Sequence, residues 1–211
     1  KASTKIYLAA RSLAHHHYKN WDSGIALYCE HLEQDSVEQL VLGVKLATYQ
    51  IGTYKKEEKV HLFFSSSFLL EIVSSKDVHW DSAVFKADSM MECMKLIDAP
   101  PNQKTPEFLA RWALNSSAEF GYTADVLYKD DLIKEGLEAI LAVGQGSKFP
   151  PVLIKTEYKP KGSSSKTPKL GLVGKGITFD TGGLSIKGSQ NLHYMKSDMG
   201  GAAAVLGAVE L

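Results

Sequence analysis

Residues 174–187 read Gly-Lys-Gly-Ile-Thr-Phe-Asp-Thr-Gly-Gly-Leu-Ser-Ile-Lys, and they directly follow the apolar segment 170–173. A short apolar run bounded by turn residues predicts a buried strand. Because sites in open α/β sheets form beyond the carboxyl ends of strands, we expect Lys175 and Asp180 at that edge. The glycines permit tight turns and close backbone approach. The stretch therefore predicts a small, charged site at a sheet edge.

A second acidic position, Asp198, lies within residues 195–204, which read Met-Lys-Ser-Asp-Met-Gly-Gly-Ala-Ala-Ala. The run of small residues from Gly200 to Ala208 predicts a helix packed closely against a neighbour. A carboxylate directly before that helix would lie near its positive end. The candidate site residues are therefore Lys175, Asp180, Lys187 and Asp198.

Two carboxylates and two ammonium groups in one pocket could form simple ion pairs, but buried ion pairs contribute little to stability because desolvation is costly. Divalent cations give the carboxylates a stronger reason to converge. Hard oxygen ligands suit zinc, manganese or magnesium, and paired metals are used for hydrolysis. A lysine binds a metal only when neutral, so its pKa near ~10.4 must fall by several units. Adjacent dications would cause that fall.

Other interpretations of the charged segment account for it less well. A surface-loop charge cluster is the plainest alternative, but random loops seldom combine so many glycines with this order of charges. A phosphate-binding loop fails because Lys169 replaces its first glycine and Gly176 replaces its Ser/Thr. A dinucleotide fingerprint fails because Phe179 stands where its third glycine belongs.

The two segments resemble the active-site core of the leucine aminopeptidase family of two-metal peptidases. The resemblance implies that Lys175 and Asp198 bind one metal and that Asp180 bridges both. It implies that Lys187 stays charged, polarises the scissile carbonyl and stabilises the oxyanion. Met195 matches a position that lines the pocket for the first side chain of the substrate. The implied cofactors are two divalent ions, zinc or manganese, with magnesium as a further candidate.

The family also has a later Asn-Thr-Asp-Ala-Glu-Gly-Arg segment, which this sequence does not contain. That segment supplies a further aspartate and a glutamate to the metals, and an arginine that holds a bicarbonate. The resemblance therefore implies a chain that lacks the C-terminal part of the catalytic domain. Either the chain is a fragment, or a second chain completes the site.

The first part of the chain, residues 1–88, predicts an N-terminal α/β domain that is incomplete at its start. Ser36 is predicted to cap a helix that continues to Ile51 with apolar residues at helical spacing. Residues 60–64, Val-His-Leu-Phe-Phe, predict a buried strand. A connector helix is predicted for 89–101, its helical part ending at Asp98 before two prolines.

Residues 102–211 predict the first part of a catalytic α/β domain. Thr105-Pro106-Glu107 indicates a helix start with a cap, a first-turn proline and an acidic first turn. Further strands are predicted at 123–128, 152–156 and 170–173, with a short helix at 130–135. This alternation favours an α/β class with a mixed, largely parallel sheet covered by helices.

The composition is that of an ordinary globular protein, 44% hydrophobic and 23% charged. Lys plus Arg equals Asp plus Glu at 24 each, so nothing indicates nucleic acid or an anionic membrane as a partner. The sequence contains no run of 18 apolar residues, so it predicts no membrane-spanning helix. Two cysteines, Cys29 and Cys93, cannot form a disulfide framework, which favours a cytoplasmic location.

The function expected from the resemblance is a metal-dependent aminopeptidase that releases N-terminal residues, with leucine preferred, from peptides. The resemblance also implies a homo-oligomer, a hexamer in the family. The alternative is a catalytically inactive fragment or paralogue that acts in assembly or protein interaction. All four charged site residues are present in the sequence, which favours the metal-dependent aminopeptidase.

Overall fold

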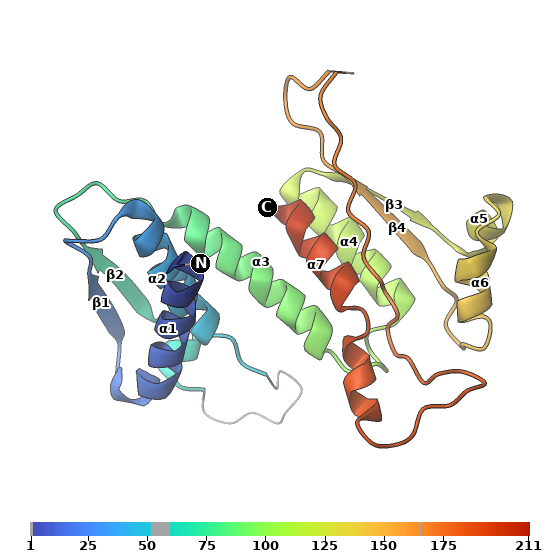
Figure 1. Cartoon of the computed structure of the whole chain (residues 1–211), viewed down its shortest axis with the longest axis horizontal. Coiled ribbons are helices and arrows are strands. Elements are labelled where there is room, and N and C mark those ends of the chain that lie inside the picture. Colours follow the sequence, from blue (N-terminus) through green and yellow to red (C-terminus); the bar gives the residue numbers. More distant parts are fainter. Residues whose placement is uncertain (1, 52–59, 165) are drawn as a thin grey trace. The chain divides into compact units, whose positions relative to one another are not determined.

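The structure, a computed structural model, describes residues 2–51, 60–164 and 166–211. It divides into two compact units, Lys1–Glu92 and Cys93–Leu211, called here the N-terminal and C-terminal units. Figure 1 shows helices together with short strand pairs in each, which confirms the predicted α/β class. The predicted domain limits at residues 88 and 101 stay predictions.

The N-terminal unit packs two helices over a two-stranded parallel pair. Strand β1 (Gly24–Tyr28) pairs with β2 (Leu69–Val73), so that Gly24 lies opposite Leu69. The other elements are α1 (Ala2–His17), η1 (Tyr18–Asn20), α2 (Gln34–Ala47), η2 (Leu62–Phe64) and the first part of α3 (Asp81–Asp98). The two 3-10 helices, η1 and η2, are single turns.

Helices α1 and α2 approach closely at Gly43. A Cβ atom built there would meet the carbonyl oxygen of Tyr7, so only glycine fits this crossing. Ala10 and Ala14 of α1 are buried against Val44 of α2, in a core that apolar residues of both strands also join. Small residues on the facing sides thus allow the two helices to pack closely over the sheet.

Three predictions for this unit need correction, one for a strand and two for the limits of helices. The strand at 60–64 was wrong, because Phe63 is fully buried among the rings of Tyr18, Trp21 and Phe68 rather than in a sheet. Its aromatic residues form η2, and β2 further along supplies the partner of β1. The sequence pattern of 60–64 therefore predicted burial correctly at Phe63 but not at Val60 or Leu62, which are exposed, and it predicted the backbone conformation wrongly.

The predicted helix boundaries also shift. Helix α2 begins at Gln34 rather than at a Ser36 cap, and it ends at Ala47, where Thr48 donates its hydroxyl hydrogen to the carbonyl of Lys45. Helix α3 ends at Asp98 as predicted, but it begins at Asp81, eight residues before the predicted start. Ala83 and Ala87 are buried on one face of this added part, so packing there extends the helix.

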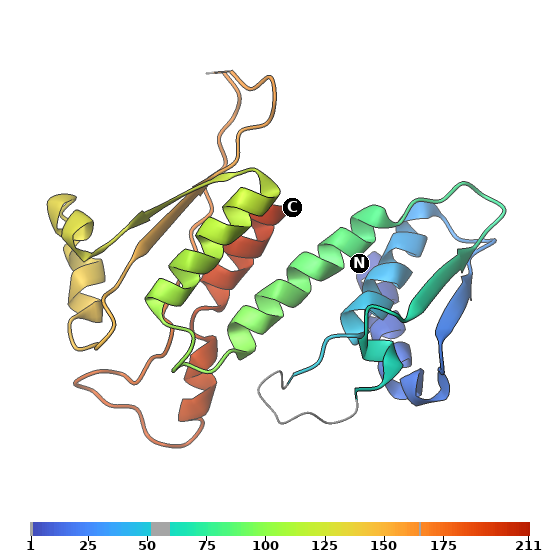
Figure 2. The same cartoon turned by 180° about the vertical axis from the view of Figure 1, so that it is seen from behind.

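The C-terminal unit joins an antiparallel strand pair to a pair of helices that lie side by side. Strands β3 (Thr123–Leu127) and β4 (Leu153–Glu157) pair with Thr123 opposite Glu157. Figures 1 and 2 show α4 beside α7 from opposite directions. The other elements, with their bounds, are α4 (Pro106–Phe120), α5 (Lys129–Lys134), α6 (Glu138–Gly144), η3 (Leu192–Ser197) and α7 (Gly200–Glu210).

The start of α4 follows the prediction. The hydroxyl of Thr105 accepts a hydrogen bond from the backbone N–H of Phe108, and Pro106 occupies the first turn. The helix ends at Gly121, whose φ of 76° is the left-handed conformation that closes many helices. Strand β3 and the short helix α5 also lie within a residue or so of their predicted positions.

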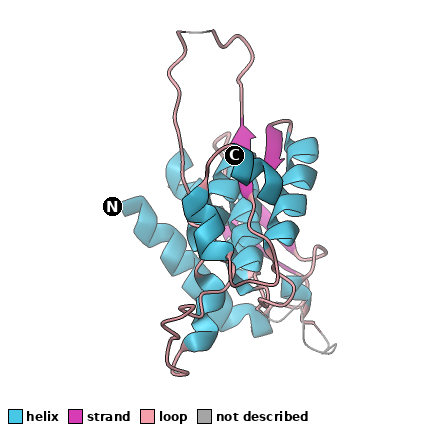
Figure 3. Cartoon of the chain, turned by 90° about the vertical axis from the view of Figure 1, so that its right-hand side faces the viewer, coloured by secondary structure: helices cyan, strands magenta, loops and turns pink. Residues whose placement is uncertain are grey.

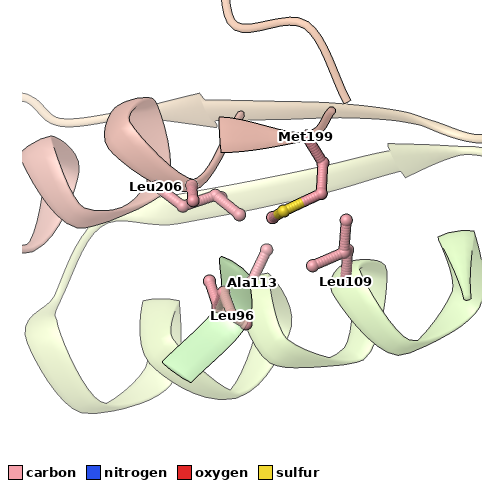
Figure 4. Packing of buried hydrophobic residues seen from close by; sticks show 6 residues of the cluster. Leu96, Leu109, Ala113, Met199 and Leu206 are labelled. Carbon is pink, nitrogen blue, oxygen red and sulfur yellow. The ribbon is translucent and has the colours of Figure 1, made fainter. Parts of the chain in front are cut away.

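The core of this unit lies between α4, α7 and the last part of α3 (Figure 4). Leu109 and Ala113 of α4 contact Met199 and Leu206, which come from the region of α7, and Leu96 completes the cluster. Met199 is fully buried, and it directly follows Asp198 in the sequence. The core therefore fixes the backbone immediately beside a candidate site residue.

The strand predicted at 170–173 is absent. Leu170 is 86% exposed and Val173 fully exposed, and no described residue pairs with this segment. Figure 3 shows the chain after β4 mainly as loop. An apolar run forms a strand only where another strand is available for its backbone hydrogen bonds. The strand pair that the described part of this unit does form is antiparallel, so the predicted parallel strands are not seen in it.

No helix in the described ranges combines the length and the apolar character required to cross a membrane.

Candidate metal and peptidase site

The first pair of site residues is Lys175 and Asp198. The ammonium nitrogen of Lys175 donates a hydrogen bond of 2.8 Å to Asp198 Oδ1, and it also lies 2.8 Å from Oδ2. The contact with Oδ2 lacks hydrogen-bond geometry. Oδ2 is buried and has no hydrogen-bond partner among the described residues. This buried carboxylate oxygen is thus held by the charge of Lys175 and not by a hydrogen bond from a described residue.

The second pair is Lys187 and Asp180. Lys187 Nζ donates to Asp180 Oδ2 at 2.7 Å and contacts the sulfur of Met195 at 3.0 Å. The backbone N–H of Gly182 donates to the other carboxylate oxygen, Oδ1, at 2.9 Å. The structure therefore brings together Asp180, Lys187 and Met195, three of the predicted site residues, from two separate segments.

Backbone packing against α7 places Lys175. The carbonyl of Lys175 accepts a hydrogen bond of 2.9 Å from the N–H of Ala202, in the first turn of α7. A Cβ atom at Gly174 would lie 2.4 Å from the carbonyl oxygen of Gly201, closer than such atoms approach. The two chain segments can therefore meet only because position 174 has no side chain.

A tight loop carries Asp180 and Lys187. The N–H of Lys187 donates to the carbonyl of Thr181 at 2.8 Å and closes the loop. Gly182 has a φ of 88°, and a Cβ atom there would collide with the carbonyl of Ser185. Glycine is therefore required at this turn, which returns the Lys187 ammonium to the Asp180 carboxylate.

The four charges influence one another. The hydrogen bond from Lys175 to Asp198 raises the pKa of Lys175, and the charges of Asp198 and Asp180 add to that effect. The hydrogen bond from Lys187 lowers the pKa of Asp180, assisted by the Gly182 N–H and by the charges of Lys187 and Lys175. Because Lys175 and Asp180 each affect the other, the two pairs form one electrostatic cluster.

The donor set of this cluster fits a divalent cation. The buried Oδ2 of Asp198, which accepts no hydrogen bond among the described residues, is the kind of hard ligand that such ions prefer, and Asp180 offers a second carboxylate. Lys175, whose pKa these carboxylates raise, would have to lose its proton before joining them as a neutral amine, and a bound dication would favour that loss. Among residues 2–51, 60–164 and 166–211, no group of three His, Cys, Asp or Glu side chains forms a complete cation site.

These features describe an α/β protein with part of a candidate divalent-metal site, and the comparisons with known proteins define the family. The catalytic-domain profile of the cytosol aminopeptidase family matches residues 91–211, more than half of the chain. The chain belongs to this family. A probable cytosol aminopeptidase from Alkaliphilus metalliredigens is 37% identical over 189 residues, which are 86% of this chain and 37% of that relative.

Solved structures agree with this assignment. The leucyl aminopeptidase from Trypanosoma cruzi matches 95% of this chain and 39% of its own, with a TM-score of 0.77 and 27% identity. The bottromycin maturation enzyme BotP, in complex with Mn, matches 100% of this chain and 44% of its own, with a TM-score of 0.76 and 28% identity. The chain thus spans well under half the length of these proteins.

Proposed function

We propose that this chain supplies part of the metal site and the oxyanion-stabilising lysine of a metal-dependent aminopeptidase. The observation that carries the proposal is the cluster of two Lys–Asp pairs, with a buried Asp198 oxygen that lies in the ion pair with Lys175 but accepts no hydrogen bond among the described residues, inside the region that matches the family. The reaction is release of N-terminal residues from peptides by hydrolysis.

In this proposal, Lys175 and Asp198 would hold one divalent cation, and Asp180 would be shared between that cation and a second one, as the family resemblance implies. When bound, the cations would activate water and polarise the scissile carbonyl. The protein's part is to keep these side chains converged, through the Ala202–Lys175 backbone hydrogen bond and the buried Met199 beside Asp198. Such preorganisation lowers the cost of gathering like-charged ligands.

Lys187 acts on the substrate. Its ammonium lies beside Asp180, and it can donate a hydrogen bond to the oxygen on which negative charge develops during attack at the carbonyl. Met195, in contact with the same ammonium, provides an apolar wall for the first side chain of the peptide. This wall is the basis for proposing a preference for leucine and similar apolar residues.

The remaining features of the proposal come from the family. The metals are zinc or manganese, with magnesium as a further candidate, and manganese is the metal named with BotP. A bicarbonate held by the longer protein, a homo-hexamer and a cytoplasmic location complete it. The relatives are named cytosol aminopeptidases, which supports the location.

The test is metal content and hydrolysis of leucyl-p-nitroanilide, measured on the purified chain with Mn²⁺ or Zn²⁺ added. Binding that Asp198→Asn abolishes would support the assignment of the site, and turnover would show that another chain completes it. Absence of both binding and turnover would favour the alternative, a non-catalytic fragment or paralogue. A matched control is Asp125→Asn, which changes an exposed aspartate paired with Lys155.

A further inference from the structure

Lys104 is a fully buried lysine at the turn between α3 and α4. Its ammonium donates hydrogen bonds to the carbonyl of Ile97 at 2.9 Å and to the carbonyl of Lys196 at 2.6 Å. Its backbone N–H donates to the carbonyl of Pro100. One side chain therefore joins the last turn of α3 to the last turn of η3. Lys104 and Lys196 are 92 positions apart in the sequence.

A buried ammonium needs a specific reason to be there. The pKa of Lys104 is lowered to about 8, mainly by burial and also by the nearby charge of Lys196, while the charge of Asp98 opposes both effects. An apolar side chain would fill the same space without that cost. What an apolar side chain cannot do is donate to two carbonyls at helix ends, where a cation is favoured by the helix dipole. The hydrogen bonds are therefore what distinguishes lysine at this position.

Lys196, whose carbonyl accepts from Lys104, is held through both its backbone and its side chain. Its carbonyl accepts from Lys104, and its own ammonium donates to the carbonyl of Asp98 at 3.0 Å and lies 3.7 Å from the carboxylate of that residue. Lys196 directly follows Met195, and Asp198 is two residues further on. Met199, the next residue, is buried in the core. Asp198 thus lies between two fixed points.

We propose that Lys104 is a positioning residue, which fixes η3 through the carbonyl of Lys196 and so holds Met195 and Asp198 in register with Lys187 and Lys175. Its value for catalysis depends on the proposed function, whereas the positioning itself does not. Lys104 touches no candidate ligand directly; it acts through the backbone of Lys196. Sequence analysis did not single it out, because a lysine directly before a helix cap is ordinarily solvated.

The test is hydrogen–deuterium exchange of the backbone amides in the whole chain, comparing Lys104→Met with the wild type. Methionine is one atom shorter than lysine, has nearly the same volume, and removes the donors. Exchange in residues 192–198 is expected to rise roughly tenfold, the effect of losing one charged hydrogen bond, while β3 and β4 stay unchanged. Lys161→Met, which alters an exposed lysine of the same unit, is the control and should change neither region.

Unchanged exchange in residues 192–198, or a rise spread evenly through the C-terminal unit, would overturn the proposal. If Lys104→Met fails to fold, Lys104→Gln is the second variant, because its amide keeps N–H donors while its shorter side chain weakens the hydrogen bonds to the two carbonyls. A smaller rise confined to residues 192–198 is then expected, and an even rise again counts against positioning.

A measurement of Mn²⁺ binding separates this proposal from the proposed function. Binding is monitored as the loss of the electron paramagnetic resonance signal of the free ion. Lys104→Met should weaken binding roughly tenfold, as outer-sphere partners of metal ligands do, and Lys161→Met should not. If the wild-type chain binds no Mn²⁺, the proposed function loses its support, and the exchange experiment still decides the role of Lys104.

Discussion

Ser116 on α4 donates a hydrogen bond of 2.5 Å to the carboxylate of Glu210 on α7, and both side chains are buried. This contact joins the two helices that enclose the core of the C-terminal unit. It is a polar link inside an otherwise apolar contact. Its strength therefore bears on how firmly α7, and the site residues that precede it, are held.

Ser116→Ala should lower the free energy of unfolding by about 1–3 kcal/mol, because a buried carboxylate loses the hydrogen bond that the serine hydroxyl donates to it. Urea unfolding followed by circular dichroism measures the change. The neighbouring Ser117 is half-buried, and its hydroxyl donates to the carbonyl of Leu114 within the same helix, so Ser117→Ala should stay within ~0.5 kcal/mol of wild type. Equal effects of the two variants would contradict the importance of the buried link.

Gly174→Ala should destabilise the C-terminal unit by about 1–3 kcal/mol, because the added methyl group collides with the carbonyl of Gly201. The same collision should displace Lys175 and weaken Mn²⁺ binding. Gly171 has open space around its Cβ position, so Gly171→Ala is the matched control. Thermal unfolding and Mn²⁺ titration of both variants decide the matter, and wild-type behaviour of Gly174→Ala would show that the two segments do not meet.

Asp180→Asn should weaken Mn²⁺ binding by more than ~100-fold, since outer-sphere changes alone cost ~10–100-fold and Asp180 is the proposed bridging ligand. The amide is similar in size to the carboxylate and still accepts from the Gly182 N–H, so the loop should be kept. Calorimetric titration with Mn²⁺ measures the effect. Asp125→Asn serves as the control. Tight Mn²⁺ binding by Asp180→Asn would show that Asp180 is not a metal ligand.

Lys187→Met should lower kcat of the proposed aminopeptidase by about 10²–10³-fold and leave metal content near normal, because the proposed role of the ammonium is to stabilise developing charge rather than to bind the metals. Hydrolysis of leucyl-p-nitroanilide and elemental analysis of the same sample give both readouts. Loss of metal together with activity would instead assign Lys187 to holding Asp180 in place.

The lowered pKa of Lys104 predicts that the stability of the chain depends on pH. This pKa is lowered from 10.5 to about 8 in the folded chain, so the unfolded chain binds more protons between these values. The free energy of unfolding should therefore rise with pH through that window, by up to ~3 kcal/mol relative to Lys104→Met. The charges that face Lys104 are Asp98 and Lys196, both retained in the variant. Urea unfolding at pH 7 and pH 10 measures the difference, and parallel pH profiles would contradict it.

Local signals in the sequence predicted the elements that local chemistry determines. Thr105 and Pro106 specify the start of α4 through a hydroxyl cap and a fixed φ, and the small residues after Asp198 specify α7. Strands were harder, since a strand exists only with a partner. The apolar patterns of 60–64 and 170–173 indicated burial or β structure, and neither segment has a strand partner in the described chain.

The candidate site was predictable in its residues and not in its pairing. Family resemblance selected Lys175, Asp180, Lys187, Met195 and Asp198, and the structure brings each into contact with at least one other. Nothing in the sequence specifies that Lys175 pairs with Asp198 and Lys187 with Asp180, because this depends on how the loop after Gly174 folds back. Lys104 could not be predicted either, since its contacts join residues far apart in the chain.

The exposed segment 170–173 affects how the chain behaves in solution. Leu170, Leu172 and Val173 present apolar side chains and unpaired backbone groups, which together favour edge-to-edge association and capture of hydrophobic dyes. The formal net charge is zero at pH 7, so long-range repulsion between molecules is weak there. Concentrated samples should therefore scatter light most near neutral pH and disperse as pH moves away from it.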